Sequence, residues 1–226
     1  RAHTHEGVVY TSDQTWSGNM SLNEDVVIAS GATLLIESGT HINVTEDITI
    51  TIQGNLQIQG TPEAPVSIWG SWFAENSVQA RWQGFLLDSG SVASVFHAMI
   101  SDSRGGFDVE SGATLTIEST HFADSMIGVW NKGSMTGAGF ECQSATTTCL
   151  RVDGTANLDT VTSSNSAGVV HIVNGGDATI DLIESDMDSD VLVLDGGSTY
   201  SGEIQAAGFT RMIRASDSVT ATITPV

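Results

Sequence analysis

Residues 30–38 read Ser-Gly-Ala-Thr-Leu-Leu-Ile-Glu-Ser, and residues 111–119 read Ser-Gly-Ala-Thr-Leu-Thr-Ile-Glu-Ser. Eight of these nine positions match across a separation of 81 residues. A shorter period lies in the second half of the chain, where five glycines follow one another every 21 residues: Gly112, Gly133, Gly154, Gly175 and Gly196. An internal period of this length is typical of solenoid proteins, in which each repeat packs only on its neighbours.

Each 21-residue unit ends in a short run rich in β-branched residues. Apolar positions in these runs align in two columns that are two residues apart, which is typical of strands with one buried face. Arg151 and Arg214 lie between the columns and are predicted to face outward. The first column is predicted to contain Val129, Leu150, His171, Leu192 and Ile213, and the second Val152, Val173, Leu194 and Ala215. In this alignment His171 is either a buried neutral histidine or a sign of a local register shift that exposes it.

The runs lack the 3.6-residue period of a helix and are rich in Thr, Val, Ile and Gly, which excludes a helical solenoid. Three short strands per unit predict an all-β parallel β-solenoid. About nine coils of roughly 21 residues fit into residues 24–226, and one strand spacing of about 4.8 Å per coil gives a rod on the order of 45 Å long. Residues 1–23 are predicted to form an N-terminal cap, and residues 69–82 an aromatic-rich insertion.

Four segments nearer the N-terminus carry a family resemblance. Residues 26–40 read Val-Val-Ile-Ala-Ser-Gly-Ala-Thr-Leu-Leu-Ile-Glu-Ser-Gly-Thr, residues 54–61 Gly-Asn-Leu-Gln-Ile-Gln-Gly-Thr, residues 64–68 Ala-Pro-Val-Ser-Ile and residues 82–85 Trp-Gln-Gly-Phe. In this order they resemble the opening coils of right-handed parallel β-helix proteins of the pectin-lyase-like superfamily, especially the large secreted and surface-anchored members. The resemblance covers the chain from about residue 15 to the end. It implies the fold but no single activity, because this fold carries lyases, hydrolases, adhesins and passive scaffolds.

The charge of the chain restricts its partners. The 226 residues include 27 Asp and Glu but only 7 Lys and Arg, so the formal net charge is −20. Nucleic acids and anionic membrane surfaces are bound by clustered basic residues, and both are therefore excluded as partners. No run of about 18 apolar residues is present, so no transmembrane span is expected. The acidic composition suits an extracellular or cell-surface protein in salty medium, with the carboxylates on the outside of the rod.

The two cysteines, Cys142 and Cys149, are seven positions apart. A metal site would need further Cys or His at ligand spacing, and none is nearby. In an extracellular chain the pair is expected to form a local disulfide, and the alternative is two separate buried thiols.

The resemblance raises the question of catalysis. Pectate lyases of the superfamily use Asp-bound calcium and an arginine base, and polygalacturonases use paired aspartates with Gly-His-Gly and Arg-Ile-Lys segments. The chain contains neither segment, and its nearest run, Arg-Met-Ile-Arg at residues 211–214, departs from the motif. No catalytic residue is therefore carried over, and no enzymatic activity is expected. The negative charge would also repel polyuronates unless calcium bridged the two.

The densest acidic run spans residues 184–190 and contains Asp186, Asp188 and Asp190 at alternate positions. On an extended segment these three carboxylates would share one face and could bind Ca²⁺. The alternative is a solvated acidic turn. Asp190 also precedes Arg211 by one period, so an ion pair between adjacent coils is expected.

Two further binding hypotheses concern the N-terminus and the insertion. If Arg1 is the mature terminus, its amine, two backbone amides and the imidazole of His3 could surround Cu²⁺ in a square plane, with His5 as an added ligand. The alternative is a frayed end. In the insertion, Trp72 and Phe73 are candidates for stacking on sugar rings, whereas Trp82 is interpreted as structural.

Two classes of function remain. The first is a non-catalytic extracellular β-helix that acts as a stalk, an adhesin or a self-assembling component of a filament or surface layer, with itself or surface glycans as partners and with no required cofactor. The second is a polysaccharide-active enzyme or a glycan-binding module. A cleft with two carboxylates, or a cluster of aspartates beside an outward-facing arginine, would favour the second class, and a featureless outer face would favour the first.

Overall fold

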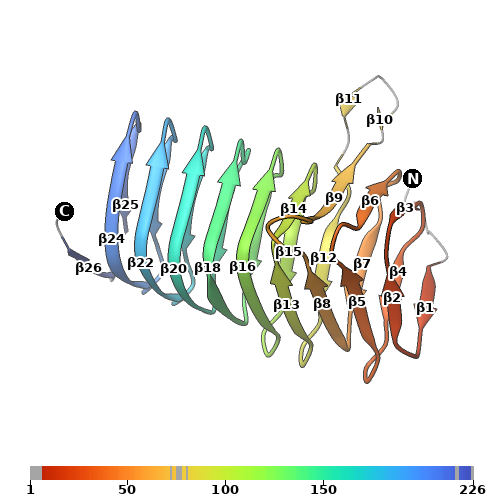
Figure 1. Ribbon diagram of the computed structural model, residues 1–226. Helices are drawn as coiled ribbons and strands as arrows, with labels where there is room; N and C mark the ends of the chain where they lie inside the picture. Colours follow the sequence, from red (N-terminus) through yellow and green to blue (C-terminus); the bar gives the residue numbers. More distant parts are fainter. Residues whose placement is uncertain (1–6, 72, 75–77, 80, 217–218, 225–226) are drawn as a thin grey trace.

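The structure is a computed structural model that describes residues 7–71, 73–74, 78–79, 81–216 and 219–224. Within these ranges the chain forms 26 strands and no helix. The described residues therefore form no helix of the length and apolarity needed to cross a membrane. Parallel strands stack into a β-solenoid of about nine coils with a spacing of about 22 residues (Figure 1). The predicted fold class is confirmed.

The first sheet runs along the whole rod, and each of its ten strands is parallel to its neighbours. In spatial order it contains β1 (Val8–Tyr10), β4 (Val26–Ile28), β7 (Thr49–Ile52), β12 (Gly84–Leu87), β15 (Gly105–Val109), β17 (Ile127–Asn131), β19 (Thr148–Val152), β21 (Gly168–Ile172), β23 (Asp190–Leu194) and β25 (Arg211–Ala215).

The second sheet follows the same axis. Its main path contains β2 (Gln14–Trp16), β5 (Thr33–Glu37), β8 (Asn55–Gln59), β13 (Val92–Phe96), β16 (Thr114–Ala123), β18 (Ser134–Gln143), β20 (Thr155–Ser164), β22 (Asp177–Asp186), β24 (Thr199–Ala207) and β26 (Thr220–Thr224).

A third face begins as a separate row of parallel strands, namely β3 (Asn19–Leu22), β6 (His41–Val44), β9 (Val66–Gly70) and β14 (Ala98–Ser101). At β16 this row joins the second sheet, because Met99 to Ser101 pair with the second half of that strand. From there on one long strand replaces two short ones in each coil. The insertion forms a small antiparallel hairpin of β10 (Phe73–Ala74) and β11 (Val78–Gln79), which projects from the rod beside β9 (Figure 1).

The core is one continuous apolar column along the described part of the rod. Its middle is aromatic: the rings of Phe85 and Phe107 stack with centroids 4.9 Å apart, and those of Phe122 and Phe140 lie 5.1 Å apart. Trp82 is fully buried and donates its indole N–H to the Ser101 carbonyl at 2.9 Å, which agrees with the structural role expected for it. Burial at roughly 25 cal/mol per Å² of apolar surface stabilises the stack of coils.

The predicted columns are correct except in one coil. His171 is opposite Arg151 and Val193 and faces outward, while Val170 occupies the inward position next to Leu150. The prediction that His171 and Val173 belong to the inward columns was therefore wrong, and the register-shift alternative holds. The cause is turn length, because the coil that leads to β21 combines a two-residue turn at 153–154 with a three-residue turn at 165–167 and is one residue shorter than the coil before it. A longer turn at residues 173–176 restores the period.

The periodic glycines stand at the turns between the first and second sheets, and some are required by close packing between coils. A Cβ on Gly154 would lie 2.2 Å from the carbonyl oxygen of Gly133, and one on Gly133 would lie 2.4 Å from that of Ala113. No side chain fits at such distances, so glycine is needed wherever successive turns stack this tightly.

A second set of turns, which leads back to the first sheet, contains one residue per coil in the left-handed conformation: Asp102, Asp124, Ser144, Asn165, Met187 and Gly208. Asp, Asn and Gly tolerate this conformation, whereas an unbranched apolar side chain has no compensation for its cost of about 1–2 kcal/mol. Met187 has a φ of 59° and is 64% exposed, so little packing is lost if it is replaced.

Replacement of Met187 by asparagine is expected to raise the free energy of unfolding by about 0.5–1 kcal/mol, because it removes backbone strain without removing core contacts. Urea denaturation of the two proteins measures the difference. Met126, an exposed turn residue outside the left-handed set, is the control, and Met126→Asn is expected to give no gain. An equal effect of both substitutions would contradict the explanation by backbone strain.

Candidate functional site

The first sheet carries a cluster of charges around an indole, which we call the charged ladder: Asp108, Glu110, Trp130, Lys132, Arg151 and Asp153. The Lys132 ammonium pairs with Asp108 at 2.8 Å and with Glu110 at 2.6 Å. Its nitrogen also lies 4.2 Å from the centroid of the Trp130 ring, and the Arg151 guanidinium lies 4.4 Å from the same centroid. Both distances are within the range of cation–π attraction. The ring is thus covered by cations of its own chain.

Hydrogen bonds extend this ladder to the next coil. Arg151 donates to Asp153 at 2.9 Å and 3.3 Å, and the Asn174 amide donates to the same carboxylate at 2.9 Å. Burial alone would raise the pKa of Asp153, but these hydrogen bonds outweigh it and hold that pKa below its usual value. Burial likewise opposes the charge of Lys132, yet its two carboxylate partners leave the pKa raised. Both groups are therefore charged at neutral pH.

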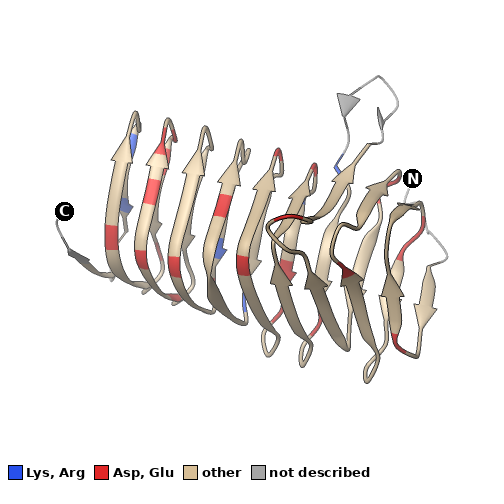
Figure 2. Cartoon of the chain, in the orientation of Figure 1, with Lys and Arg blue, Asp and Glu red and all other residues tan. Residues whose placement is uncertain are grey.

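Figure 2 shows acidic residues along the whole rod and only a few basic ones. Of the basic residues that the structure describes, four form ion pairs with carboxylates: Arg104 with Asp47, Lys132 with Asp108 and Glu110, Arg151 with Asp153, and Arg211 with Asp190. The last pair confirms the expected contact between adjacent coils, at 2.9 Å. The basic side chains on this rod are therefore used mainly in ion pairs with its own carboxylates.

His171 continues the outer face beyond the ladder, and it is half-buried between Arg151 on one adjacent strand and Val193 on the other. Burial and the charges of Arg151 and Arg214 lower the pKa of His171, and the carboxylates of Asp195 and Asp153 oppose this only in part. The imidazole is therefore neutral at neutral pH.

Because the unfolded chain binds this proton at higher pH than the folded chain, the stabilisation due to neutral His171 is complete above pH 6.5 and is lost as the pH falls below it. Substitution His171→Gln is expected to reduce the loss of stability between pH 8 and pH 5. Urea midpoints at the two pH values measure this, with His121→Gln on the third face as the control variant. The same pH dependence in wild type and His171→Gln would contradict the prediction.

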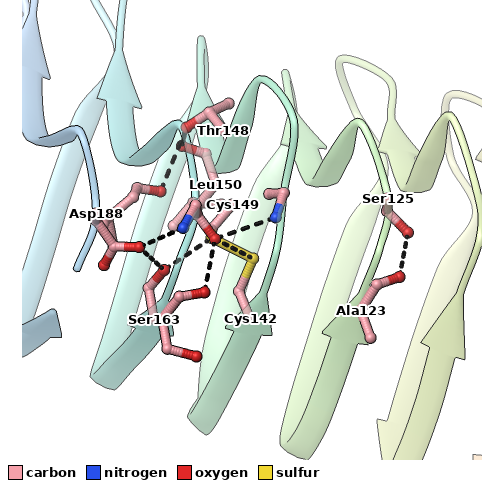
Figure 3. Close-up of a disulfide and its surroundings, with 12 residues drawn as sticks. Ala123, Ser125, Cys142, Thr148, Cys149, Leu150, Ser163 and Asp188 are labelled. Atoms are coloured by element: carbon pink, nitrogen blue, oxygen red, sulfur yellow. Dashed lines mark hydrogen bonds between the residues drawn. A yellow bond between two sulfur atoms is a disulfide. The ribbon is translucent and has the colours of Figure 1, made fainter. Parts of the chain in front are cut away.

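A second polar cluster lies inside the rod, next to the cysteines (Figure 3). Asp188 is only 1% exposed, although carboxylates are seldom buried without partners. It accepts hydrogen bonds from the Ser166 backbone N–H at 2.6 Å, the Ser163 hydroxyl at 3.2 Å and the Ser185 hydroxyl at 2.7 Å. The expectation that the acidic residues all lie outside the rod is corrected here.

Cys142 and Cys149 form the expected disulfide, with an S–S distance of 2.20 Å. Both cysteines are buried. The Cys149 sulfur lies 3.2 Å from the Ser163 hydroxyl and 3.4 Å from the Ser166 hydroxyl, so the disulfide and the Asp188 carboxylate share the same two serines (Figure 3). The two features form one unit at the centre of the second half of the rod.

The predicted calcium ligands do not come together. Asp186 is exposed at the end of β22, Asp188 points into the core and Asp190 pairs with Arg211 on the first sheet. The left-handed backbone at Met187 ends the extended alternation on which the prediction relied. Among the described residues, no group of three or more His, Cys, Asp or Glu side chains is placed to hold a metal ion.

The remaining predicted ligands belong to the N-terminus and the insertion. His3, His5 and Trp72 lie outside the described residues, and so does the side chain of Phe73, whose backbone forms part of β10. The copper and glycan-stacking hypotheses for these residues therefore stay predictions.

The third face carries a shallow pocket that the sequence analysis did not predict. It has a volume of about 190 Å³ and is lined by Ser67, Ile68, Trp69, Met99, Ser101 and Asp102. Trp69 stands in the sequence among three other aromatic residues of the insertion, so nothing in the chain alone distinguishes it. The available signal was the alternation along β9, in which Ser67 and Trp69 stand between the inward positions Val66, Ile68 and Gly70.

Comparison with known proteins found no matching family model, no similar curated protein and no similar solved structure. The three clusters described above, namely the charged ladder, the Asp188 unit and the pocket beside Trp69, are therefore interpreted from their own geometry.

Proposed function

We propose that the chain is a non-catalytic module of the extracellular medium or cell surface, in which the β-solenoid acts as a stiff stalk. The charged ladder is its main support. Lys132 binds carboxylates of the preceding coil, and Asp153 binds the amide of the following one, so these charged groups stabilise the stacking of coils. A charge held in several such contacts is poorly suited to proton transfer with a substrate.

The proposal also covers where the protein is located and the family to which its coils are assigned. A buried disulfide suits an oxidising compartment, and a net charge of −20 suits a protein that works in salt. The four segments within residues 26–85 resemble right-handed parallel β-helix proteins of the pectin-lyase-like superfamily, and we assign the coils to that group on this resemblance. The stalk requires no cofactor.

The test is an activity assay on purified protein. Neutral and acidic polysaccharides are incubated with the protein, with and without Ca²⁺, and new reducing ends and the ultraviolet absorbance of unsaturated lyase products are measured. We expect no product above the level of a heat-denatured control. Turnover that is lost in Arg151→Ala or Asp153→Ala would overturn the proposal and make the charged ladder an active site.

A further inference from the structure

The pocket on the third face is built by two neighbouring parallel strands. On β9, Ser67 and Trp69 face outward, and on β14, Met99 and Ser101 face outward. The pairing sets Ser67 beside Met99 and Trp69 beside Ser101. The two large side chains thus occupy one diagonal and the two small ones the other, so a hollow remains between the indole and the thioether.

The indole of Trp69 is held in place from the side away from the pocket. The imidazole of His41 on β6 contacts it edge to face, with ring centroids 6.4 Å apart and an angle of 64° between the planes. Asn43 on the same strand is the direct neighbour of Trp69 in the pairing. A ring fixed in this way loses little freedom when a ligand packs on it.

The polar groups of the pocket lie on its other diagonal and at its end. Ser67 and Ser101 provide hydroxyls, and the Ser101 hydroxyl donates to the Asp102 carboxylate at 2.8 Å. Asp102 takes part in the left-handed turn directly after β14, and its Cβ would lie 3.2 Å from a Cβ added to Gly70. A side chain at position 70 would therefore press on the turn that carries Asp102.

We propose that this pocket binds one ring of a neutral sugar chain. The C–H face of a pyranose would pack on the indole and the Met99 thioether, and its hydroxyls would donate to Asp102 and exchange hydrogen bonds with the serines. An aromatic platform with a few convergent polar groups is the usual composition of a small-molecule site. The volume of about 190 Å³ is smaller than the roughly 300–1,000 Å³ of sites for drug-sized ligands, and it suits a single ring.

Charge selects the class of sugar. Among the described residues that line the pocket, Asp102 has the only ionisable side chain, and the whole chain carries −20. Uronates and sulfated sugars would meet a negative group both in the pocket and around it, so neutral sugars are preferred. The pocket lies on a different face from the charged ladder. The proposal rests on the proposed extracellular function only because an extracellular location exposes the rod to glycans.

Binding is tested by saturation-transfer NMR with maltohexaose, cellohexaose, mannohexaose and chitohexaose, and with oligogalacturonate as the charged comparison. We expect at least one neutral oligosaccharide to bind the wild-type chain, and Trp69→Ala to weaken that binding about tenfold or more. Asp102→Asn keeps a residue that tolerates the left-handed turn and is expected to weaken binding less. Trp130→Ala, which removes an outward-facing indole on the first sheet, is the matched control and is expected to bind as wild type does.

Melting curves of each variant establish that it is folded before its binding is compared. Absence of binding to all four neutral probes at millimolar concentration would overturn the proposal, as would unchanged affinity in folded Trp69→Ala or a preference for oligogalacturonate. Loss of binding in Trp72→Ala but not in Trp69→Ala would overturn it in favour of the insertion. Cleavage of a probe would instead overturn the proposal that the protein is a non-catalytic stalk, whereas the proposal that the pocket binds sugar would stand.

Discussion

Replacement of Asp188 by alanine is expected to lower the free energy of unfolding by about 3–5 kcal/mol, which is large for a substitution that removes only one carboxylate. The carboxylate is 1% exposed and accepts three hydrogen bonds from donors of two coils. Without it, the Ser166 N–H and the hydroxyls of Ser163 and Ser185 remain buried and lack this acceptor. Leaving a buried donor unsatisfied costs about 1–3 kcal/mol. Urea or thermal denaturation measures the loss.

Two variants separate this explanation from a general effect of removing charge. Asp186→Ala removes an exposed carboxylate two residues earlier and is expected to change stability by less than about 0.5 kcal/mol. Asp188→Asn keeps one acceptor oxygen for the Ser166 N–H, and its amide can donate to a serine hydroxyl, so an intermediate loss is expected. Similar losses for Asp186→Ala and Asp188→Ala would contradict the buried hydrogen-bond network as the cause.

Removal of the disulfide by the double substitution Cys142→Ala and Cys149→Ala is expected to cost about 2–3 kcal/mol, since the bond closes only a short loop. In the folded wild type we expect the bond to resist thiol reductants, because Cys142 is 4% and Cys149 0% exposed. Alkylation of reduced cysteines followed by mass measurement, with and without urea, tests this.

The disulfide and Asp188 are expected to be linked. Asp188→Ala loosens the serines that contact the Cys149 sulfur, so reduction of the bond in this variant should be faster than in wild type under native conditions. Rapid reduction of the wild type without denaturant would show instead that the bond opens to solvent in the folded state.

The fold could be predicted from the sequence because every coil of a solenoid has the same buried, inward-facing positions to fill. Val129, Leu150 and Leu192 each meet the same inward environment, so the same residue type recurs with the same period. His171 is the exception, because it was predicted to face inward and faces outward. The coil that leads to its strand is one residue short, and a shift of one residue exchanges the inner and outer faces.

The sites were harder to predict because they depend on contacts between coils. An alternating set of aspartates has the same pattern whether the strand continues or turns, and only the left-handed backbone at Met187 sends Asp188 inward. The pocket beside Trp69 needs Met99 and Asp102 from the following coil. No local pattern carries that information, whereas Asp190 and Arg211, one full period apart, could be paired correctly.

The parallel pairing of coils has a mechanical consequence. Hydrogen bonds between strands run along the axis of the rod, so a force applied to its two ends would load the coils in series and peel them off one at a time. The disulfide joins residues of successive strands only seven positions apart, and it does not clamp one turn of the solenoid to the next. The contacts of Lys132 and of Asp188 do span adjacent turns, and in single-molecule stretching they should mark the coils that yield last.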